Sequence, residues 1–307
     1  MAPAGIDQLA GQRLMVGFEG TEFNSDLEFL IKELKVGGII LFSINIENPI
    51  QVTALCQSIQ DFAFACGQPP VFIAIDQEGG TVARLRKPHF KEFCGVPELK
   101  DESDAAVFAR GMAAELSKLG INMNMAPVMD VAPKDFGSIM EKRIFGYDPQ
   151  RVSEMGRIII EQHQKQNIMA VAKHFPGIGR TTLDSHLDMP ELAATINDLE
   201  SFDLIPFNAA IHNHVSGIMM SHIRYTEIDP KWPASLSIKI AQNLLRKQMG
   251  FNGIVMTDDL DMGAIINHYD IYTVIQQILA ADVDLALICH KGPNIKIAFD
   301  EIRKSIS

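Results

Sequence analysis

The sequence Ile168-Met-Ala-Val-Ala172 leads directly into KHFPGIGRTTLDSH, the fourteen residues Lys173–His186. The first segment is apolar and strand-like. The second brings together a lysine, two histidines, an aspartate and a Pro-Gly-x-Gly turn. Loops that leave a rigid scaffold commonly carry binding and catalytic groups. The abrupt change from apolar to ionisable residues therefore predicts a functional loop at the end of a buried strand.

Similar apolar runs recur along the chain and alternate with stretches of helical periodicity. The strand-like runs are Leu14–Phe18, Gly38–Phe42, Val71–Ile75, Asn122–Val128, Ile168–Ala172, Gly217–Met220, Gly253–Met256 and Leu285–Cys289. The helical stretches are Ser25–Leu34, Pro49–Cys66, Ser103–Leu119, Pro149–Gln166, Asp198–Asn213, Leu236–Met249, Ile271–Ala280 and Pro293–Ser307. Eight β units that are each followed by an α unit, with no long linker, predict a single (β/α)8 TIM barrel over residues 1–307. A doubly wound sheet is the alternative.

Polar side chains follow six of the eight predicted strands. They are Asp76, Asp130, Lys173 with His174, Ser221 with His222, Asp258 with Asp259, and His290. In a parallel barrel all these positions lie at the carboxyl rim of the strands, where barrel active sites are built. The sequence therefore predicts an active site at this rim.

One chemistry that suits these residues is glycoside cleavage by a carboxylate nucleophile and a separate proton donor. Asp258 leaves an apolar strand and is expected to point into the barrel mouth, whereas strand alternation turns Asp259 away from it. Asp184 and His186 are two residues apart in an extended loop, so both can lie on the same side. An aspartate bound to one imidazole nitrogen fixes the tautomer and leaves the other nitrogen free for proton transfer.

A metal-dependent hydrolase is a second interpretation of the same rim. Its candidate ligands are His174, His186, His222, Asp258 and His290. The first strand has no His-x-His pair, however, and no HExxH or comparable close spacing occurs elsewhere in the chain. A phosphate site after strands seven and eight is less well supported, since the segment after the eighth strand offers only Gly292 and Pro293.

Beyond the loop and Asp258, motifs in most of the chain resemble the β-N-acetylhexosaminidases of glycoside hydrolase family 3, single-domain barrels that release N-acetylglucosamine from cell-wall fragments. The motifs, in chain order, are Gly37–Phe42, Ala74–Gly80 with Arg84-Leu85, Asn124–Val131, Arg143–Gly146, Lys173–Gly177, Asp184–His186, Ser221–Ile223, Pro233–Ser237 and Thr257–Met262. Each motif is short, and their occurrence in this order makes the resemblance specific.

The resemblance implies a role for each matching residue. Asp258 would be the nucleophile of a retaining mechanism, and His186 held by Asp184 would be the acid/base. The residues that would hold the non-reducing N-acetylglucosamine are Asp76, Arg84, Arg143, Lys173 and His174. The implied substrates are muropeptides or chitooligosaccharides, with no cofactor and no metal. Ile178 and Arg180 depart from the family pattern, so packing and closure of the loop are expected to differ here.

Composition sets limits on partners and location. Lys+Arg 27 against Asp+Glu 38 gives a net charge of −11, which disfavours nucleic acid and anionic membranes as partners. The first residues do not resemble a signal peptide, and no apolar stretch has the length of a membrane helix. With four cysteines in no metal-binding pattern, these features predict a cytoplasmic protein. A barrel that binds amino sugars without cleaving them, and a family 3 β-glucosidase or phosphorylase, remain alternatives.

Overall fold

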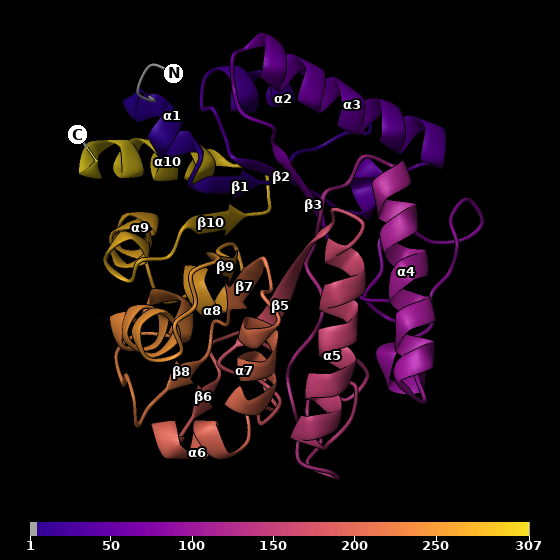
Figure 1. Cartoon of the computed structure of the whole chain (residues 1–307). Coiled ribbons are helices and arrows are strands. Elements are labelled where there is room, and N and C mark those ends of the chain that lie inside the picture. The colour runs from indigo at the N-terminus through magenta and orange to yellow at the C-terminus, as the bar shows by residue number, and fades with distance from the viewer. Residues whose placement is uncertain (1–4, 307) are drawn as a thin grey trace.

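Eight parallel strands close into one barrel in the computed structural model, which describes residues 5–306 (Figure 1). The barrel strands are β1 (Leu14–Val16), β2 (Gly38–Leu41), β3 (Phe72–Ile75), β4 (Met123–Asn124), β5 (Met169–Phe175), β7 (Gly217–Met220), β9 (Ile254–Asp259) and β10 (Leu285–Ile288). Each strand pairs with the next barrel strand in the sequence, and β10 closes the circle against β1. The predicted (β/α)8 barrel is confirmed.

Two apolar layers hold the barrel together, as strand alternation requires. Side chains that point inward form a cluster rich in methionine, and side chains that point outward pack beneath the helices. On β7, for example, Met219 belongs to the inner cluster, whereas Ile218 and Met220 belong to the outer one. The barrel is therefore a filled core whose free space lies at its rim.

Helices cover the outside of the barrel (Figure 1). They are α1 (Ile6–Gly11), α2 (Ser25–Lys32), α3 (Pro49–Ala65), α4 (Glu102–Lys118), α5 (Pro149–Gln164), α6 (Ile196–Ser201), α7 (Leu204–His212), α8 (Gly263–Ile266), α9 (Ile271–Ala280) and α10 (Pro293–Ser305). A π-helical segment, η4 (Ile238–Gln248), takes the place of an α-helix between β7 and β9. Helix α1 packs on α10, so the two ends of the described chain lie together.

Several predicted elements have different bounds. The helix predicted over Asp198–Asn213 is two helices, α6 and α7, which are separated at Phe202 and Asp203. The helix predicted to end at Ser307 ends at Ser305, and residue 307 lies outside the described residues. Two short strands that were not predicted, β6 (Glu191–Leu192) and β8 (Arg224–Tyr225), pair in a separate small sheet.

Two barrel strands run further into the rim than their apolar runs indicate, and each contains a bulge. On β5, Ala172 pairs with Ile218 and Phe175 pairs with Met220, so three steps on β5 match two on β7. On β9, the three steps from Met256 to Asp259 match the two from Leu285 to Leu287 on β10. A bulge interrupts strand alternation. Each strand therefore presents two consecutive polar residues to the rim: Lys173 with His174, and Asp258 with Asp259.

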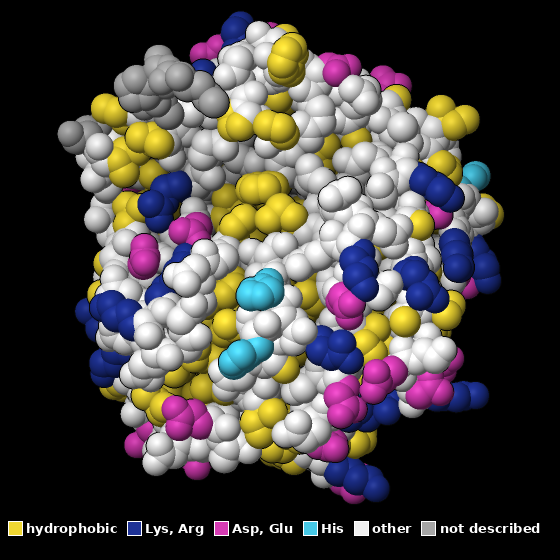
Figure 2. All heavy atoms as spheres, viewed as in Figure 1, with side chains coloured by type: hydrophobic (Ala, Val, Ile, Leu, Met, Phe, Trp, Pro, Cys, Tyr) yellow, Lys and Arg dark blue, Asp and Glu magenta, His cyan; other side chains and the backbone are white. Residues whose placement is uncertain are grey.

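The surface and the helices add two observations on partners. On the face shown in Figure 2, Lys and Arg side chains are interspersed with Asp and Glu and do not gather into one basic surface. Within residues 5–306, no helix is both long enough and apolar enough to cross a membrane.

Candidate active site

A cavity of about 400 Å³ opens at the carboxyl ends of the barrel strands. It is lined by all eight residues predicted for catalysis or substrate binding, namely Asp76, Arg84, Arg143, Lys173, His174, Asp184, His186 and Asp258. Apolar side chains that include Ile40, Phe42, Met219 and Leu287 form other parts of its wall. The cavity thus combines a charged wall with an apolar one.

Lys173 is the centre of the charged wall. Its side chain is 2% exposed, and its ammonium lies 2.8 Å from Asp76 Oδ1 and 2.7 Å from Glu78 Oε1. Burial alone would lower the pKa of Lys173, but the two carboxylates raise it above its ordinary value. Lys173 is therefore a fixed cation that orients both acids.

Two arginines complete this network. Arg143 donates to both oxygens of Glu78, at 3.0 and 2.7 Å, and Arg84 donates to Asp76 at 3.2 Å. Burial would raise the pKa of Asp76 and Glu78, but the neighbouring cations hold both pKa values below their ordinary range. Ionised acids and fixed cations side by side offer acceptors and donors to the hydroxyl groups of a sugar.

The pKa values of Asp76 and Glu78 predict how acid affects the fold. The unfolded chain takes up protons on these carboxyls near their ordinary values of 3.8 and 4.5, whereas the folded chain stays ionised to lower pH. The unfolded state therefore binds more protons in acid, and the stabilisation present above about pH 5 is lost as the pH falls. Urea unfolding of the wild type and Asp76→Asn from about pH 6 to about pH 3 should show their difference shrinking in acid. A difference that is independent of pH would contradict this.

His174 is oriented by Asp130, a fully buried residue beyond the end of β4. His174 Nδ1 lies 2.8 Å from Asp130 Oδ2, and the other oxygen of Asp130 accepts from the backbone N–H of Ile178 at 2.8 Å. His174 Nε2 lies 3.5 Å from Arg143 Nη2. Since a guanidinium can only donate, this network favours the tautomer with the proton on Nδ1.

Asp184 and His186 form the predicted pair on the loop of residues 177–187, called the catalytic loop below. Asp184 Oδ1 lies 2.8 Å from His186 Nδ1 and accepts from the backbone N–H of His186 at 2.9 Å. Burial would raise the pKa of Asp184, and the hydrogen bonds from His186 lower it. The imidazole is 69% exposed. With Nδ1 bound to Asp184, Nε2 is the nitrogen available for proton transfer.

Asp258 lies at the β9 bulge, with one carboxylate oxygen accepting from the N–H of Asp259 at 2.8 Å. Asp259 also lines the cavity, so the prediction that it points away is wrong. The reason is the bulge, at which Thr257 Oγ1 accepts the β10 hydrogen bond from Leu287 N. Burial raises the pKa of Asp259 to about 6, although backbone N–H groups of Asp261 and Cys289 oppose this.

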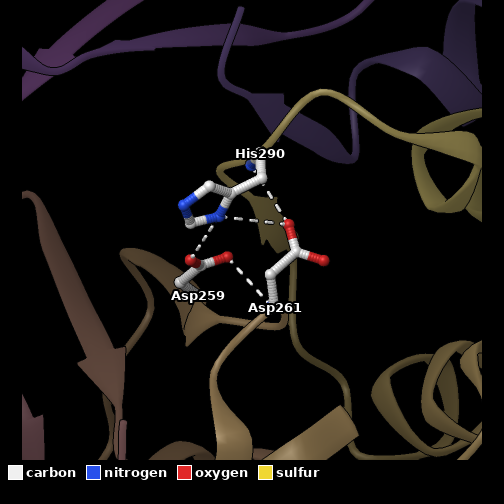
Figure 3. A group of neighbouring side chains, drawn as sticks. All are labelled: Asp259, Asp261 and His290. Carbon is white, nitrogen blue, oxygen red and sulfur yellow. Dashed lines mark hydrogen bonds and ion pairs between the residues drawn. The ribbon is translucent and has the colours of Figure 1, made fainter. Parts of the chain in front are cut away.

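Figure 3 shows Asp259 and Asp261 turned toward His290, whose Nδ1 lies 3.6 Å from each carboxylate. In the described part of the chain, this is the one group of side chains with donors close enough to hold a metal ion together. Of the five ligands considered from the sequence, it contains only His290. The structure therefore does not assemble that predicted metal site.

Other residues noted in the sequence have defined partners in the structure. His222 bonds Ser235 Oγ and the carbonyl of Asp259, so it supports the strand ends. Arg180 is bound to buried Asp203 and is neither a free surface residue nor part of the cavity wall.

Glu78 is the member of the charged network that received no role from the sequence. A signal was present, because Asp76 and Glu78 are two residues apart after a strand and can share one side of an extended segment. His290, one of the rim residues noted in the sequence, also lines the cavity.

A closed parallel barrel with a cavity-lining carboxylate, Asp258, and a carboxylate-bound histidine at its carboxyl rim has the features of a barrel glycoside hydrolase. A model of the glycosyl hydrolase family 3 N terminal domain matches residues 5–306, and the chain belongs to this family. It is 31% identical over 295 residues to a β-hexosaminidase of Pseudomonas aeruginosa, covering 95% of this chain and 86% of the relative. A Nitrosomonas eutropha β-hexosaminidase is 34% identical, with 90% and 80% covered. The chain is therefore a glycoside hydrolase.

Solved structures show the same relationship. A family 3 β-N-acetylglucosaminidase from Paenibacillus sp. str. FPU-7 superposes with a TM-score of 0.95 at 34% identity, over 98% of this chain. This chain spans 58% of the length of that protein. NagZ from Neisseria gonorrhoeae superposes with a TM-score of 0.84 at 28% identity, with 95% of this chain and 84% of NagZ covered.

Proposed function

We propose that this chain is a retaining β-N-acetylglucosaminidase that removes non-reducing terminal N-acetylglucosamine from peptidoglycan-derived muropeptides. The observation that carries the proposal is that Asp258, the Asp184–His186 pair and the charged wall line one cavity. Names of relatives support the sugar: the Paenibacillus protein is a β-N-acetylglucosaminidase, and N. gonorrhoeae NagZ has been solved with N-trifluoroacetyl-D-glucosamine. Muropeptide as the source of the sugar follows from the family resemblance.

In the proposed reaction, the charged wall holds the sugar while two groups act at its anomeric carbon. Asp258 attacks, and His186 Nε2–H donates its proton to the leaving oxygen, so that the aglycone departs as an alcohol. His186, now neutral, takes a proton from water, which attacks the glycosyl-enzyme and releases the sugar with its configuration retained. Ionised Asp258 also stabilises the positive charge of the oxocarbenium-like transition state.

The apolar wall of the cavity supports an N-acetylated substrate. Ile40, Phe42 and Leu287 line the cavity, and an acetamido methyl group gains more from such a surface than a hydroxyl does. Glucose lacks this group. The proposal therefore includes a preference for N-acetylglucosamine over glucose at the non-reducing end.

Two chromogenic substrates test this function directly. We expect kcat/KM for a nitrophenyl β-N-acetylglucosaminide to exceed that for the matching β-glucoside by about ten- to a hundredfold, as the contacts of one small group allow. A glucoside preference would favour the β-glucosidase alternative. Sugar binding without turnover would favour a non-catalytic barrel.

Further assays separate the remaining alternatives. Loss of activity after exhaustive chelation would support a metal-dependent reaction. Release of a glycosyl phosphate in phosphate buffer would support a phosphorylase, which a neutral histidine base permits because it repels an incoming anion less than a carboxylate does. The single-domain organisation and the cytoplasmic location remain predictions.

A further inference from the structure

We infer that Arg180 is a positioning residue of the glycosidase reaction: its ion pair with buried Asp203 fixes the base of the catalytic loop and thereby the place of His186 at the cavity. The catalytic part of this inference rests on the proposed function. The geometric part concerns how the loop is anchored and has its own test.

The Arg180–Asp203 pair is bidentate and largely withdrawn from water. Arg180 Nε donates to Asp203 Oδ1 at 3.2 Å, and Nη2 donates to Oδ2 at 2.5 Å. The carboxylate is 0% exposed and the guanidinium side chain 22%. Among the described residues, Arg180 is the one basic side chain paired with Asp203. Removing the single cationic partner of a buried carboxylate leaves an uncompensated charge, which destabilises the structure around it.

A break between two helices holds Asp203 against the catalytic loop. It lies at the break between α6 and α7, where the chain leaves one helix and starts the next, beneath the catalytic loop. Gly177 of the loop packs directly on it, since a Cβ at Gly177 would lie 2.8 Å from Asp203 Cβ. The helix break therefore places a carboxylate against the loop at two points, Gly177 and Arg180.

The Pro-Gly-x-Gly turn before Arg180 is fixed as well. Tyr225 donates to the carbonyl of Gly177 at 2.7 Å, and the N–H of Ile178 donates to Asp130. Gly179 touches the segment after β4 so closely that a Cβ would lie 1.9 Å from the carbonyl oxygen of Val131. This turn is therefore an anchor and does not have the freedom of a hinge.

Beyond the turn, the loop has freedom only in a short stretch. Thr181 is buried, and residues 182–184 are exposed. Anchoring resumes where the carbonyls of Ser185 and His186 accept from Ala264 and Gly263 at the start of α8. Arg180 is thus the last long side chain bound to the barrel before the exposed tip that carries Asp184. Without Arg180, the loop between the turn and the Asp184–His186 pair is held only through buried Thr181, whose carbonyl accepts from the N–H of Ile139 at 3.3 Å. We therefore expect this side of the pair to become more mobile.

Displacement of His186 should lower kcat/KM more for some substrates than for others. Phenols with a high pKa need a proton from the general acid as they leave, whereas dinitrophenol leaves as an anion without one. With Arg180→Met we expect kcat/KM to fall by about ten- to a hundredfold for a phenyl β-N-acetylglucosaminide. For the dinitrophenyl substrate, we expect a change below about threefold. Arg180→Lys, which keeps the charge but not the fork, should recover part of the loss.

Arg157→Met is the matched control, because Arg157 pairs with Glu102 and Glu161 at the surface and away from the cavity. It should leave both substrates unaffected. If Arg180→Met folds poorly because Asp203 is stranded, the double variant Arg180→Met with Asp203→Asn removes the unpaired charge and should show the same leaving-group pattern. Equal losses on both substrates, or no loss on either, would overturn a positioning role.

Amide hydrogen exchange tests the anchor independently of chemistry. Residues 181–187 should exchange faster in Arg180→Met than in the wild type, and no faster in Arg157→Met. Unchanged exchange would overturn the inference even if activity fell. If the wild type cleaved neither sugar substrate, the proposed function would fail, while the exchange measurement would still decide whether Arg180 holds the loop.

Discussion

Replacing Asp258 by asparagine should lower kcat for the chromogenic N-acetylglucosaminide by several orders of magnitude and leave the fold intact. The amide can still accept the hydrogen bond that Asp258 Oδ1 accepts from Asp259 N. It can neither form the glycosyl ester nor stabilise a positive transition state by charge. Asp261→Asn is the matched control, since this acid lies three residues away and outside the cavity wall. It should retain most of the activity.

Azide can distinguish the roles of Asp258 and His186. With Asp258→Ala and a dinitrophenyl substrate, azide can attack from the face that the carboxylate has left, so the product should be the α-glycosyl azide. With His186→Ala, the glycosyl-enzyme still forms on Asp258, and azide attacks from the opposite face to give the β-glycosyl azide. The anomer is read by proton NMR. A β-azide from Asp258→Ala would contradict its assignment as the nucleophile.

The second large effect should be on stability. Lys173→Met removes the cation that lies between Asp76 and Glu78, and leaves two buried carboxylates with less compensation. Breaking a buried ion pair from one side costs about 3–5 kcal/mol of unfolding free energy. We expect a loss of this size in urea unfolding, together with weaker binding of N-acetylglucosamine, because the same ammonium lines the cavity.

Two further variants show whether burial of the charge is the cause. Lys87→Met, which removes an exposed pair with Glu92, should change stability little. Adding Glu78→Gln to Lys173→Met removes one of the stranded charges and should recover part of the loss. If Lys173→Met were as stable as the wild type, the charged wall would not be part of what holds the rim together.

The barrel could be predicted because its strands are continuous apolar runs between amphipathic helices. The arrangement of side chains at the rim was harder to predict, because it depends on the register between neighbouring strands. Strand alternation predicted that Asp259 points away from the cavity. The pairing of β9 with β10 contains an extra residue on β9, and this bulge brings Asp259 to the cavity. Lys173 and His174 were both predicted at the rim, and the β5 bulge explains how two consecutive residues can reach it. A bulge is a property of two strands together, so one strand's sequence does not disclose it.

The candidate site, too, could be predicted only in part from the sequence. Residues with ionisable groups at strand ends could be located, and the Asp184–His186 spacing correctly predicted their contact. Partners that act through burial could not be located. Asp203 lies within what was predicted as one helix, and its place under Arg180 becomes visible only with the break between α6 and α7. Asp130 likewise gains its role only when folding brings it to His174.

The methionine-rich cluster inside the barrel also affects the order of events during turnover. Met219 and Leu287 belong both to this cluster and to the wall of the cavity, so the packed interior begins where the cavity ends. Under the proposed reaction, a sugar enters with its non-reducing end first and its aglycone at the mouth. The aglycone must then leave before water can approach the glycosyl-enzyme, and the sugar leaves last. An alcohol that reaches the vacated mouth before water does would receive the sugar, making transglycosylation a built-in competitor of hydrolysis.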